Sequence, residues 1–421
     1  MTRPRKTGSG TNRQDVTMTD ITDPAIRAEV LDFFDRAFRN SRPPLEDCLT
    51  RGVWKGAFFR PEWTRVAVAD GHAVSGVVCA PRQVRFGSVL VPATTVGPVG
   101  THRHHRRKGY AAAAMHDALR AMTERGVILS YLQGLPDFYY RFGYFPYRGQ
   151  YHVRFQRDDA RKEAARGRLR TFRKTDIPAV ANIYRRVSAG RTMSARRDRK
   201  LWNWLLRYAV QAWFFPTPKV LEDSKGHIIG YLTLRKGDGM SVREIVVKPD
   251  EASCRSALGA LVREAKRREV RQIELPLPPD DAFAVFVRQY VRAEFVTWTH
   301  PTGNQLLAIL DFPTLMKRLE PELEARWRRA RTRIGNVRFT LASEIGAVGI
   351  AVTRGRVRVG EPVRGSRVVV PRRWLSGLLT GYYAVGDIAP RKGARIPARL
   401  RPALDVLFPT SCPFIYQGDN Y

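Results

Sequence analysis

The sequence predicts a mixed α/β (α+β) protein with more than one domain. The chain has 421 residues, of which 43% are hydrophobic, so it is typical of globular proteins but too long for one ordinary core. Strand-like and helix-like runs also alternate in the same order twice, over residues 21–155 and again over residues 169–300. We therefore expect two mixed-sheet domains in tandem, followed by an α+β domain over residues 303–421.

The first region begins with a predicted helix and continues as strands. Ala25 to Asn40 carries apolar side chains at helical spacing. Gly71 and Gly87 mark turns between the runs that follow. Strands are expected at residues 64–69, 72–80, 83–86, 88–91 and 95–99. The basic, polar stretch 1–20 lacks the apolar segment of a signal peptide and is predicted to be a disordered tail.

The most informative segment is a basic turn between a strand and a helix. The strand-like run ending at Val99 leads into Arg106-Arg107-Lys108-Gly109, and an alanine-rich helix is predicted over residues 111–124. The first amides of a helix have no intrahelical partners and carry about half a positive charge, so such a turn binds phosphates. Gly109 and Ala111 keep side chains out of the way of a ligand. The alternative is a solvated basic turn before an ordinary helix.

An aromatic segment follows shortly downstream. Pro136 to Tyr144 contains five aromatic residues and comes directly after a strand-like run at residues 127–132. Aromatic side chains bury large areas wherever they lie, so a loop packed on the core is one interpretation. A site beside the basic turn is the other.

The second region is predicted to repeat the first without its phosphate site. A charged stretch at residues 157–168 is expected to be a linker. A helix at residues 176–187, capped by Asp176 or Thr175, precedes strands at 220–221, 228–234 and 241–247, a helix at 254–268 and a strand at 273–277. Val247-Lys248-Pro249-Asp250-Glu251 occupies the position of the basic turn. Because its acidic pair repels phosphate, we expect this copy to be non-catalytic.

The third region shows no catalytic pattern. A strand is predicted at residues 305–311 and a helix at 314–330, with four large apolar side chains at steps of four. Short strands follow, and then helices at 372–379 and 398–407.

Bulk properties narrow the class of protein. The net charge of +34 indicates either a nucleic-acid partner or a generally arginine-rich surface, because the basic clusters at 195–200 and 326–331 lack a recognisable nucleic-acid-binding motif. The four cysteines are far apart, which argues against a zinc module or a disulfide framework and fits a reducing compartment. No apolar run approaches a membrane span, so we expect a cytoplasmic protein without a membrane partner. The histidines at 102, 104 and 105 are not expected to bind a metal.

Both informative segments resemble motifs of GCN5-related N-acetyltransferases (GNAT). Arg106-x-x-Gly109-x-Ala111 is similar to their pyrophosphate-binding signature, and Tyr139-x-x-x-Gly143-Tyr144 is similar to a segment beside their thioester. Over nearly its whole length the chain resembles the enhanced intracellular survival (Eis) family. That family has an active acetyltransferase domain, a degenerate copy and a sterol-carrier-protein-like domain. Val99-Gly100-Thr101-His102 and the ending Cys412–Tyr421 also carry this resemblance.

The resemblance implies an enzyme that moves an acetyl group from acetyl-CoA to a primary amine without a metal. Tyr139 would be the general acid, and the α-carboxylate of Tyr421 would be the general base. Homo-oligomers, often hexamers, are implied as well. The residues implied to hold acetyl-CoA are Val99, Gly100, Thr101, Arg106, Arg107, Lys108, Gly109, Tyr110, Ala111, Ala112, Gly134 and Leu135.

Some features depart from the family pattern and leave alternatives open. Arg103 stands where the family usually has proline, and Tyr140 replaces a small residue. The acceptor pocket of the best-known members is acidic, whereas this chain is strongly basic. Whether it accepts the same amines as those members is therefore left open. A polyamine, an aminoglycoside and a protein lysine all remain candidate acceptors. Residues 417–421 could instead be a frayed tail. A non-catalytic nucleic-acid-associated protein and a lipid- or acyl-binding protein are the competing functions.

Overall fold

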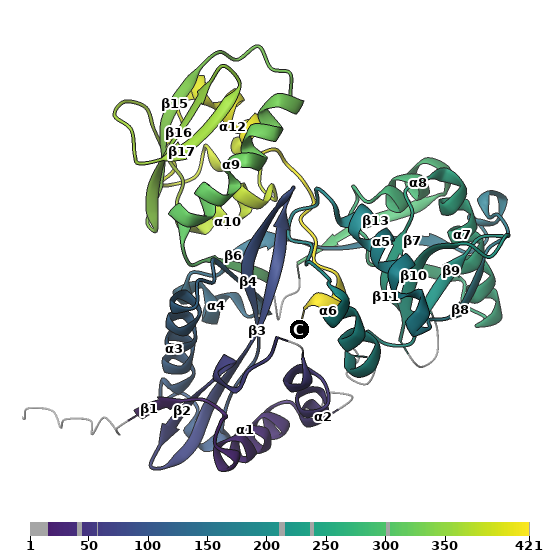
Figure 1. Ribbon diagram of the computed structural model, residues 1–421, viewed down its shortest axis with the longest axis horizontal. Coiled ribbons are helices and arrows are strands. Elements are labelled where there is room, and N and C mark those ends of the chain that lie inside the picture. Colours follow the sequence, from purple (N-terminus) through teal and green to yellow (C-terminus); the bar gives the residue numbers. More distant parts are fainter. Residues whose placement is uncertain are drawn as a thin grey trace, which may run out of the picture.

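The computed structural model describes residues 16–39, 44–56, 58–209, 215–235, 240–299 and 304–420. It confirms the mixed α/β class, with strands in sheets of seven, four, three and four among these residues. Figure 1 shows the first sheet with its helices below, the second group of sheets beside it, and the C-terminal sheet above. Among the described residues, none of the helices combines the length and apolar character needed to cross a bilayer.

The seven-stranded sheet is covered by a helix on each face. Its order is β1-β2-β3-β4-β5-β14-β6. Helix α1 (Pro24–Ala37) packs on Val66 and Val78, whereas α3 (Tyr110–Glu124) packs on their strand neighbours Ala67 and Val77. Alternate strand residues point to opposite faces, so the two helices lie on opposite sides. The strands are β1 (Val16–Thr19), β2 (Thr64–Ala69), β3 (His72–Phe86), β4 (Val89–Thr101), β5 (Leu129–Gly134), β14 (Asn304–Ile309) and β6 (Phe145–Arg148).

The second group of sheets repeats this plan. The order β11-β10-β9-β8 is linked to β12-β7-β13 by a parallel bridge between Ser241 and Glu274. Helix α7 (Glu251–Arg267) joins β11 to β12, as α3 joins β4 to β5. This correspondence supports the predicted repeat. The strands are β8 (Arg168–Thr171), β9 (Pro218–Glu222), β10 (Ile228–Leu234), β11 (Val242–Val247), β12 (Gln272–Leu275), β7 (Gln150–Gln156) and β13 (Ala293–Trp298); the other helices are α5 (Ile177–Ser188), α6 (Arg199–Trp204) and α8 (Ala282–Tyr290).

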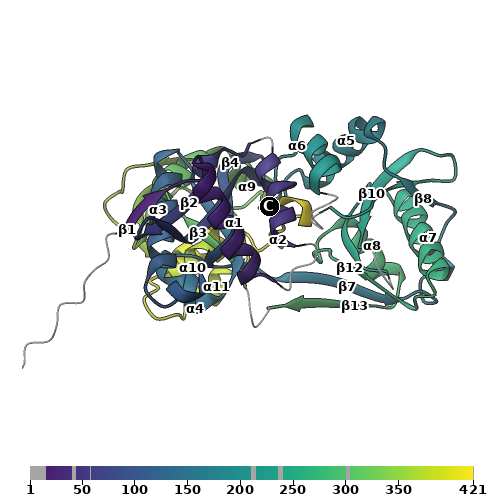
Figure 2. The same cartoon turned by 90° about the horizontal axis from the view of Figure 1, so that it is seen from below.

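The first two groups of sheets exchange strands. β14 follows the second repeat in sequence, yet it pairs with β5 and β6 of the first sheet. Conversely, β7 precedes the second repeat but pairs with β12 and β13. The pairing therefore crosses the boundary drawn at residue 155. Figure 2 shows β7 and β13 running side by side away from the first sheet.

The C-terminal sheet has the order β17-β16-β15-β18 and packs on a long helix, α9 (Phe312–Arg329). The predicted stripe of Leu315, Leu319, Leu323 and Trp327 is buried on this helix. After α12 the chain runs down, in yellow, between the other two units (Figure 1). The remaining elements are β15 (Val337–Ser343), β16 (Gly346–Thr353), β17 (Arg356–Gly360), β18 (Arg367–Val369), α2 (Leu45–Thr50), α4 (Pro136–Tyr139), α10 (Arg372–Thr380), α11 (Val385–Ile388) and α12 (Arg401–Leu407).

Some predicted elements differ from the observed ones. The gaps expected around Pro81 and Pro92 are absent, because β3 and β4 each continue through them as one long strand. Residues 1–15 of the predicted tail lie outside the described residues, whereas Val16–Thr19 pair with β2 as an edge strand. The tail was therefore predicted to extend too far. Four residues with alternating polarity gave too weak a periodic signal to be recognised as a strand.

Candidate active site

The site lies at a fork between β4 and β5. The two strands pair in parallel over only three residue pairs, from Ala93 and Leu129 to Thr95 and Tyr131. Beyond that point β4 remains paired with β3 only, and β5 remains paired with β14. A cavity of ≈ 920 Å³ occupies the opening. The predicted site residues in its wall are Val99, Gly100, Thr101, Arg106, Ala111, Gly134, Leu135 and Tyr139.

The N-terminus of α3 is open toward a ligand. Its N-cap is Gly109, which has a φ of 90° and no side chain to cap the first amides. Only glycine adopts this conformation at little cost, so the backbone at the start of α3 requires glycine at position 109. Arg106, Arg107 and Lys108 are exposed around it. In the second repeat, Asp250 instead accepts a hydrogen bond from the Ser253 amide at 2.8 Å and closes the N-terminus of α7.

A second cavity adjoins the first near this helix. It measures ≈ 640 Å³ and shares Ala37, Thr101 and Arg106 with the fork cavity. Its wall contains Arg36, Arg39 and Arg103 together with one acidic residue, Asp35. Burial and neighbouring cationic groups lower the pKa of His102, which also lines it. In the described part of the chain, no group of three or more His, Cys, Asp or Glu side chains could hold a metal ion.

Glycines set how closely the elements of the fork approach. A Cβ on Gly100 would lie 2.8 Å from the Phe34 ring, so this glycine lets α1 pack against β4. A Cβ on Gly134 would lie 2.2 Å from Cε2 of Tyr139, so β5 directly abuts the tyrosine ring. Gly143 has a φ of 82° and ends the turn that follows Tyr139. The spacing Tyr139-x-x-x-Gly143 thus reflects the backbone turn that presents the tyrosine.

The end of the chain is docked where β4 and β5 separate. The Thr95 hydroxyl donates a hydrogen bond to the carbonyl of Asn420 at 3.0 Å, and the Tyr131 hydroxyl donates to that of Asp419 at 2.9 Å. Thr95 and Tyr131 are the last paired residues before the strands part. The frayed-tail alternative is therefore wrong for residues 417–420, of which Gly418 and Asp419 are buried. Tyr421 lies outside the described residues.

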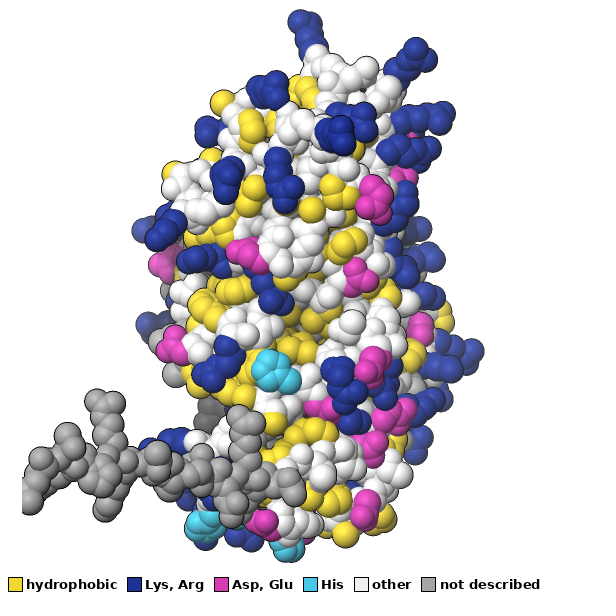
Figure 3. Space-filling view, turned by 90° about the vertical axis from the view of Figure 1, so that its left-hand side faces the viewer, with side chains coloured by type: hydrophobic (Ala, Val, Ile, Leu, Met, Phe, Trp, Pro, Cys, Tyr) yellow, Lys and Arg dark blue, Asp and Glu magenta, His cyan; other side chains and the backbone are white. Residues whose placement is uncertain are grey.

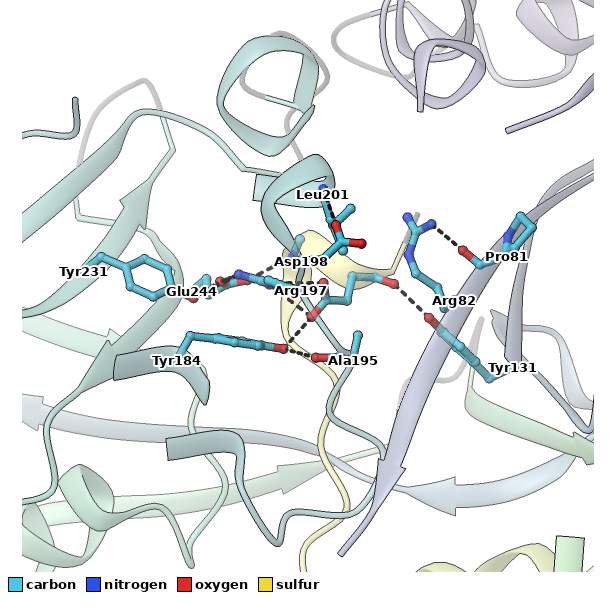
Figure 4. Close-up of polar contacts among 12 residues, drawn as sticks. Pro81, Arg82, Tyr131, Tyr184, Ala195, Arg197, Asp198, Leu201, Tyr231 and Glu244 are labelled. Carbon is cyan, nitrogen blue, oxygen red and sulfur yellow. Dashed lines mark hydrogen bonds and ion pairs between the residues drawn. The ribbon is translucent and has the colours of Figure 1, made fainter. Parts of the chain in front are cut away.

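A buried ionic cluster anchors this segment to the second repeat. Arg197 contacts Asp419 at 2.8 Å and Glu244 at 2.6 Å, and all three side chains are fully buried. Glu244 also accepts hydrogen bonds from the Tyr231 hydroxyl and the Gly418 amide. Figure 4 shows Arg197 and Glu244 beside Tyr231. Burial raises the pKa of Asp419, although Arg197 acts in the opposite direction. Burial lowers the pKa of Arg197, but Asp419 and Glu244 raise it well above its ordinary value.

We expect Arg197→Met to destabilise the protein strongly. The substitution leaves two buried carboxylates without their cation, which costs about 3–5 kcal/mol in comparable buried pairs. Arg196→Met is the matched control, because the neighbouring Arg196 is exposed. Chemical denaturation followed by circular dichroism gives the unfolding midpoint of each variant. Equal midpoints for Arg197→Met and Arg196→Met would contradict the anchoring role.

Some residues of the cavity were missed in the sequence, and some predicted ones lie outside its wall. Arg107, Lys108, Gly109, Tyr110 and Ala112 belong to the turn and first helical turn but do not line the cavity, and the Tyr110 side chain is buried in the core. Another part of the wall comes from strand ends, which carry no local motif, and from the C-terminal segment. It consists of Arg148, Gln150, Tyr151, His152, Ser241, Val242, Arg243, Glu274, Pro276, Gln305, Phe414, Ile415, Gln417 and Asn420.

Comparison with known proteins gives a family match, which lies in the first part of the chain. The family of acetyltransferase (GNAT) domains matches residues 23–146. No curated protein matches the chain significantly.

Three solved structures share the fold of almost the whole chain. A GCN5-related N-acetyltransferase from Kribbella flavida has a TM-score of 0.73 and 17% identity, over 97% of this chain and 99% of that chain. A GCN5-related N-acetyltransferase from Anabaena variabilis has a TM-score of 0.73 and 14% identity, over 96% of this chain and 99% of that chain. Eis1 from Mycobacterium abscessus has a TM-score of 0.64 and 20% identity, over 97% and 100%. The segment that matches the acetyltransferase (GNAT) domain model, residues 23–146, contains β4, β5, the N-terminus of α3 and Tyr139.

Proposed function

We propose that the protein is an acetyl-CoA-dependent N-acetyltransferase that acts on a primary amine. One observation carries this proposal: a single cavity is bounded by Arg106 beside the uncapped N-terminus of α3, by Tyr139, and by the docked chain end. Arg106, Tyr139 and Asn420 thus border one cavity where two strands separate, which supports a phosphate site, a proton donor and a base at this place.

The chemistry of the walls fits each part of acetyl-CoA. The pyrophosphate would lie on the first amides of α3, with charge from Arg106, Arg107 and Lys108. The pantetheine would lie along Val99, Gly100 and Thr101, which β5 leaves unpaired on the open side. The phosphorylated adenosine would enter the second cavity, where Arg36, Arg39 and Arg103 supply cations. The thioester would then point toward Gly134, Leu135 and Tyr139.

In the proposed reaction, the amine attacks the thioester carbonyl directly. An N–C bond forms, the C–S bond breaks, and strand amides near Val99 stabilise the oxyanion. The Tyr139 hydroxyl donates a proton to the leaving thiolate, and a base takes one from the amine.

We propose the α-carboxylate of Tyr421 as that base. The carbonyls of Asp419 and Asn420 are held at the fork, and a chain advances only about 3.8 Å per residue, so the terminus is within reach of the cavity. A carboxylate is a weak base in water, but burial raises its pKa.

The experiment that tests the function is release of coenzyme A thiol from acetyl-CoA in the presence of a panel of primary amines. We expect amine-dependent release by the wild-type protein, with a mass increase of the amine that corresponds to one acetyl group. An absence of release with every amine would contradict the proposal.

Arg106→Ala combined with Arg107→Ala should weaken acetyl-CoA binding by a few kcal/mol. Charge-assisted hydrogen bonds to phosphate contribute about 1.5–3 kcal/mol each. Arg185→Ala combined with Arg186→Ala is a matched control. Arg185 and Arg186 are also adjacent in the sequence and exposed, but they lie on α5 and line neither cavity. Calorimetric titration measures the affinities, and an unchanged dissociation constant in the first double variant would refute the phosphate site.

The high net charge does not by itself favour a nucleic-acid site. On the face in Figure 3, Lys and Arg side chains are dispersed from end to end among apolar and acidic ones. A dispersed charge of this kind favours weak, salt-sensitive binding of polyanions over a dedicated groove.

A further inference from the structure

We propose that the acceptor amine carries an anionic group, a carboxylate or a phosphate, which Arg148 and Arg243 bind. This inference rests on the proposed acetyltransferase function and names the class of its acceptor. It comes from the part of the cavity wall that is formed by β6, β7, β11, β12, β14 and the C-terminal segment.

Among the described residues of this wall, Arg243 is a cation without a counter-charge. It lies on β11, is half-buried and lines the cavity. Burial lowers its pKa, and Arg235, another cation, lowers it further. Within the described part of the chain, no carboxylate raises the pKa of Arg243. A partly desolvated guanidinium gains most from an anion that enters the cavity.

Arg148 presents a second guanidinium to the same cavity. Its side chain is buried, and its hydrogen-bond partners are the Gln305 side-chain oxygen at 3.0 Å, the Gly149 carbonyl at 3.3 Å and the Tyr147 hydroxyl at 3.3 Å. All three partners are neutral, so they fix the guanidinium without cancelling its charge. The guanidinium carbon of Arg148 also lies over the Phe414 ring, 5.8 Å from its centre.

The carboxylate side chain among the described residues of this wall, Glu274, is already engaged. Glu274 contacts Arg154 at 2.5 Å and the His152 ring at 2.7 Å. Burial lowers the pKa of His152, although Glu274 acts in the opposite direction. Glu274 therefore has its counter-charge in Arg154, so among the described side chains of this wall the positive charges of Arg148 and Arg243 remain. This wall is the opposite of an acidic pocket and disfavours polycationic amines.

The first test compares amines that differ only in the anionic group. 4-Aminobutyrate is paired with propylamine, and O-phosphoethanolamine is paired with ethanolamine. We expect kcat/KM at least about tenfold higher for the anionic member of one pair, since one good charge-assisted contact has at least that effect. The pair with the larger ratio of kcat/KM between its anionic and neutral members shows whether the site prefers a carboxylate or a phosphate. Equal kcat/KM values within both pairs, or faster acetylation of spermidine, would overturn the inference while leaving the acetyltransferase function intact.

The second test places the anion at Arg243. Arg243→Gln should raise KM for the preferred anionic amine about tenfold, and leave KM for its neutral partner and kcat nearly unchanged. Arg243→Lys should restore part of the affinity. Arg235→Gln is the matched control, because Arg235 is exposed and does not line the cavity. An equal loss with anionic and neutral amines would overturn the assignment. Absence of acetyl transfer to every amine would instead overturn the proposed function, and this inference with it.

Discussion

Replacing Tyr139 by phenylalanine is expected to lower kcat roughly 10²-fold or more, the usual effect of losing a general acid. The ring packs against Phe138 and Tyr144, with centroids 4.9 Å and 5.9 Å away. Phenylalanine preserves these contacts, so acetyl-CoA affinity should remain near that of the wild type. Steady-state thiol release and calorimetric titration measure the two quantities separately.

Tyr140→Phe is the matched control for this prediction. Tyr140 is the adjacent residue, but its side chain is 39% exposed and does not line the cavity. We expect its turnover to be nearly unchanged. If Tyr140→Phe is impaired while Tyr139→Phe is not, the general acid has been assigned to the wrong tyrosine.

Appending a few residues after Tyr421 is expected to abolish most acetyl transfer. An extension replaces the proposed terminal carboxylate with an amide, which cannot accept the proton of the amine. Deleting Tyr421 should have the same effect, because it retracts the carboxylate by about 3.5 Å. Thiol release measures the loss, and thermal unfolding should show that the fold persists.

Tyr421→Phe separates the carboxylate from the side chain. It keeps the main-chain carboxylate and the ring, so we expect it to stay active. Full activity of a protein extended at its C-terminus would contradict the assignment of the base.

The local parts of the site could be predicted from the sequence. The strand, basic turn and helix around Gly109 are consecutive in the chain, and their chemistry depends on residue types within a few positions of each other. Asp250 was recognised in the same way as unfavourable for phosphate, and the structure shows it closing its own helix N-terminus. The buried stripe of α9 follows from spacing alone.

The parts that join distant segments could not be predicted. Pairing of β14 with β5 depends on which edge is free after the whole sheet has folded, and no local pattern encodes this. Thr95 and Tyr131 look like ordinary strand residues until the chain end meets them. Arg197 lies in a basic run that resembles a solvated surface, yet it is fully buried against Asp419 and Glu244. Arg148 on β6 and Arg243 on β11 belong to different sheets and are far apart in the sequence, yet both line the same cavity.

A crystal structure of the protein with coenzyme A is the most direct test of the proposed site. We predict that the pantetheine lies between the separated ends of β4 and β5, with the pyrophosphate on the first amides of α3. The sulfur should lie within hydrogen-bonding distance of the Tyr139 hydroxyl and face the wall that contains Asn420. Coenzyme A bound outside the fork, or bound there with its sulfur away from Tyr139, would contradict the proposed site and mechanism.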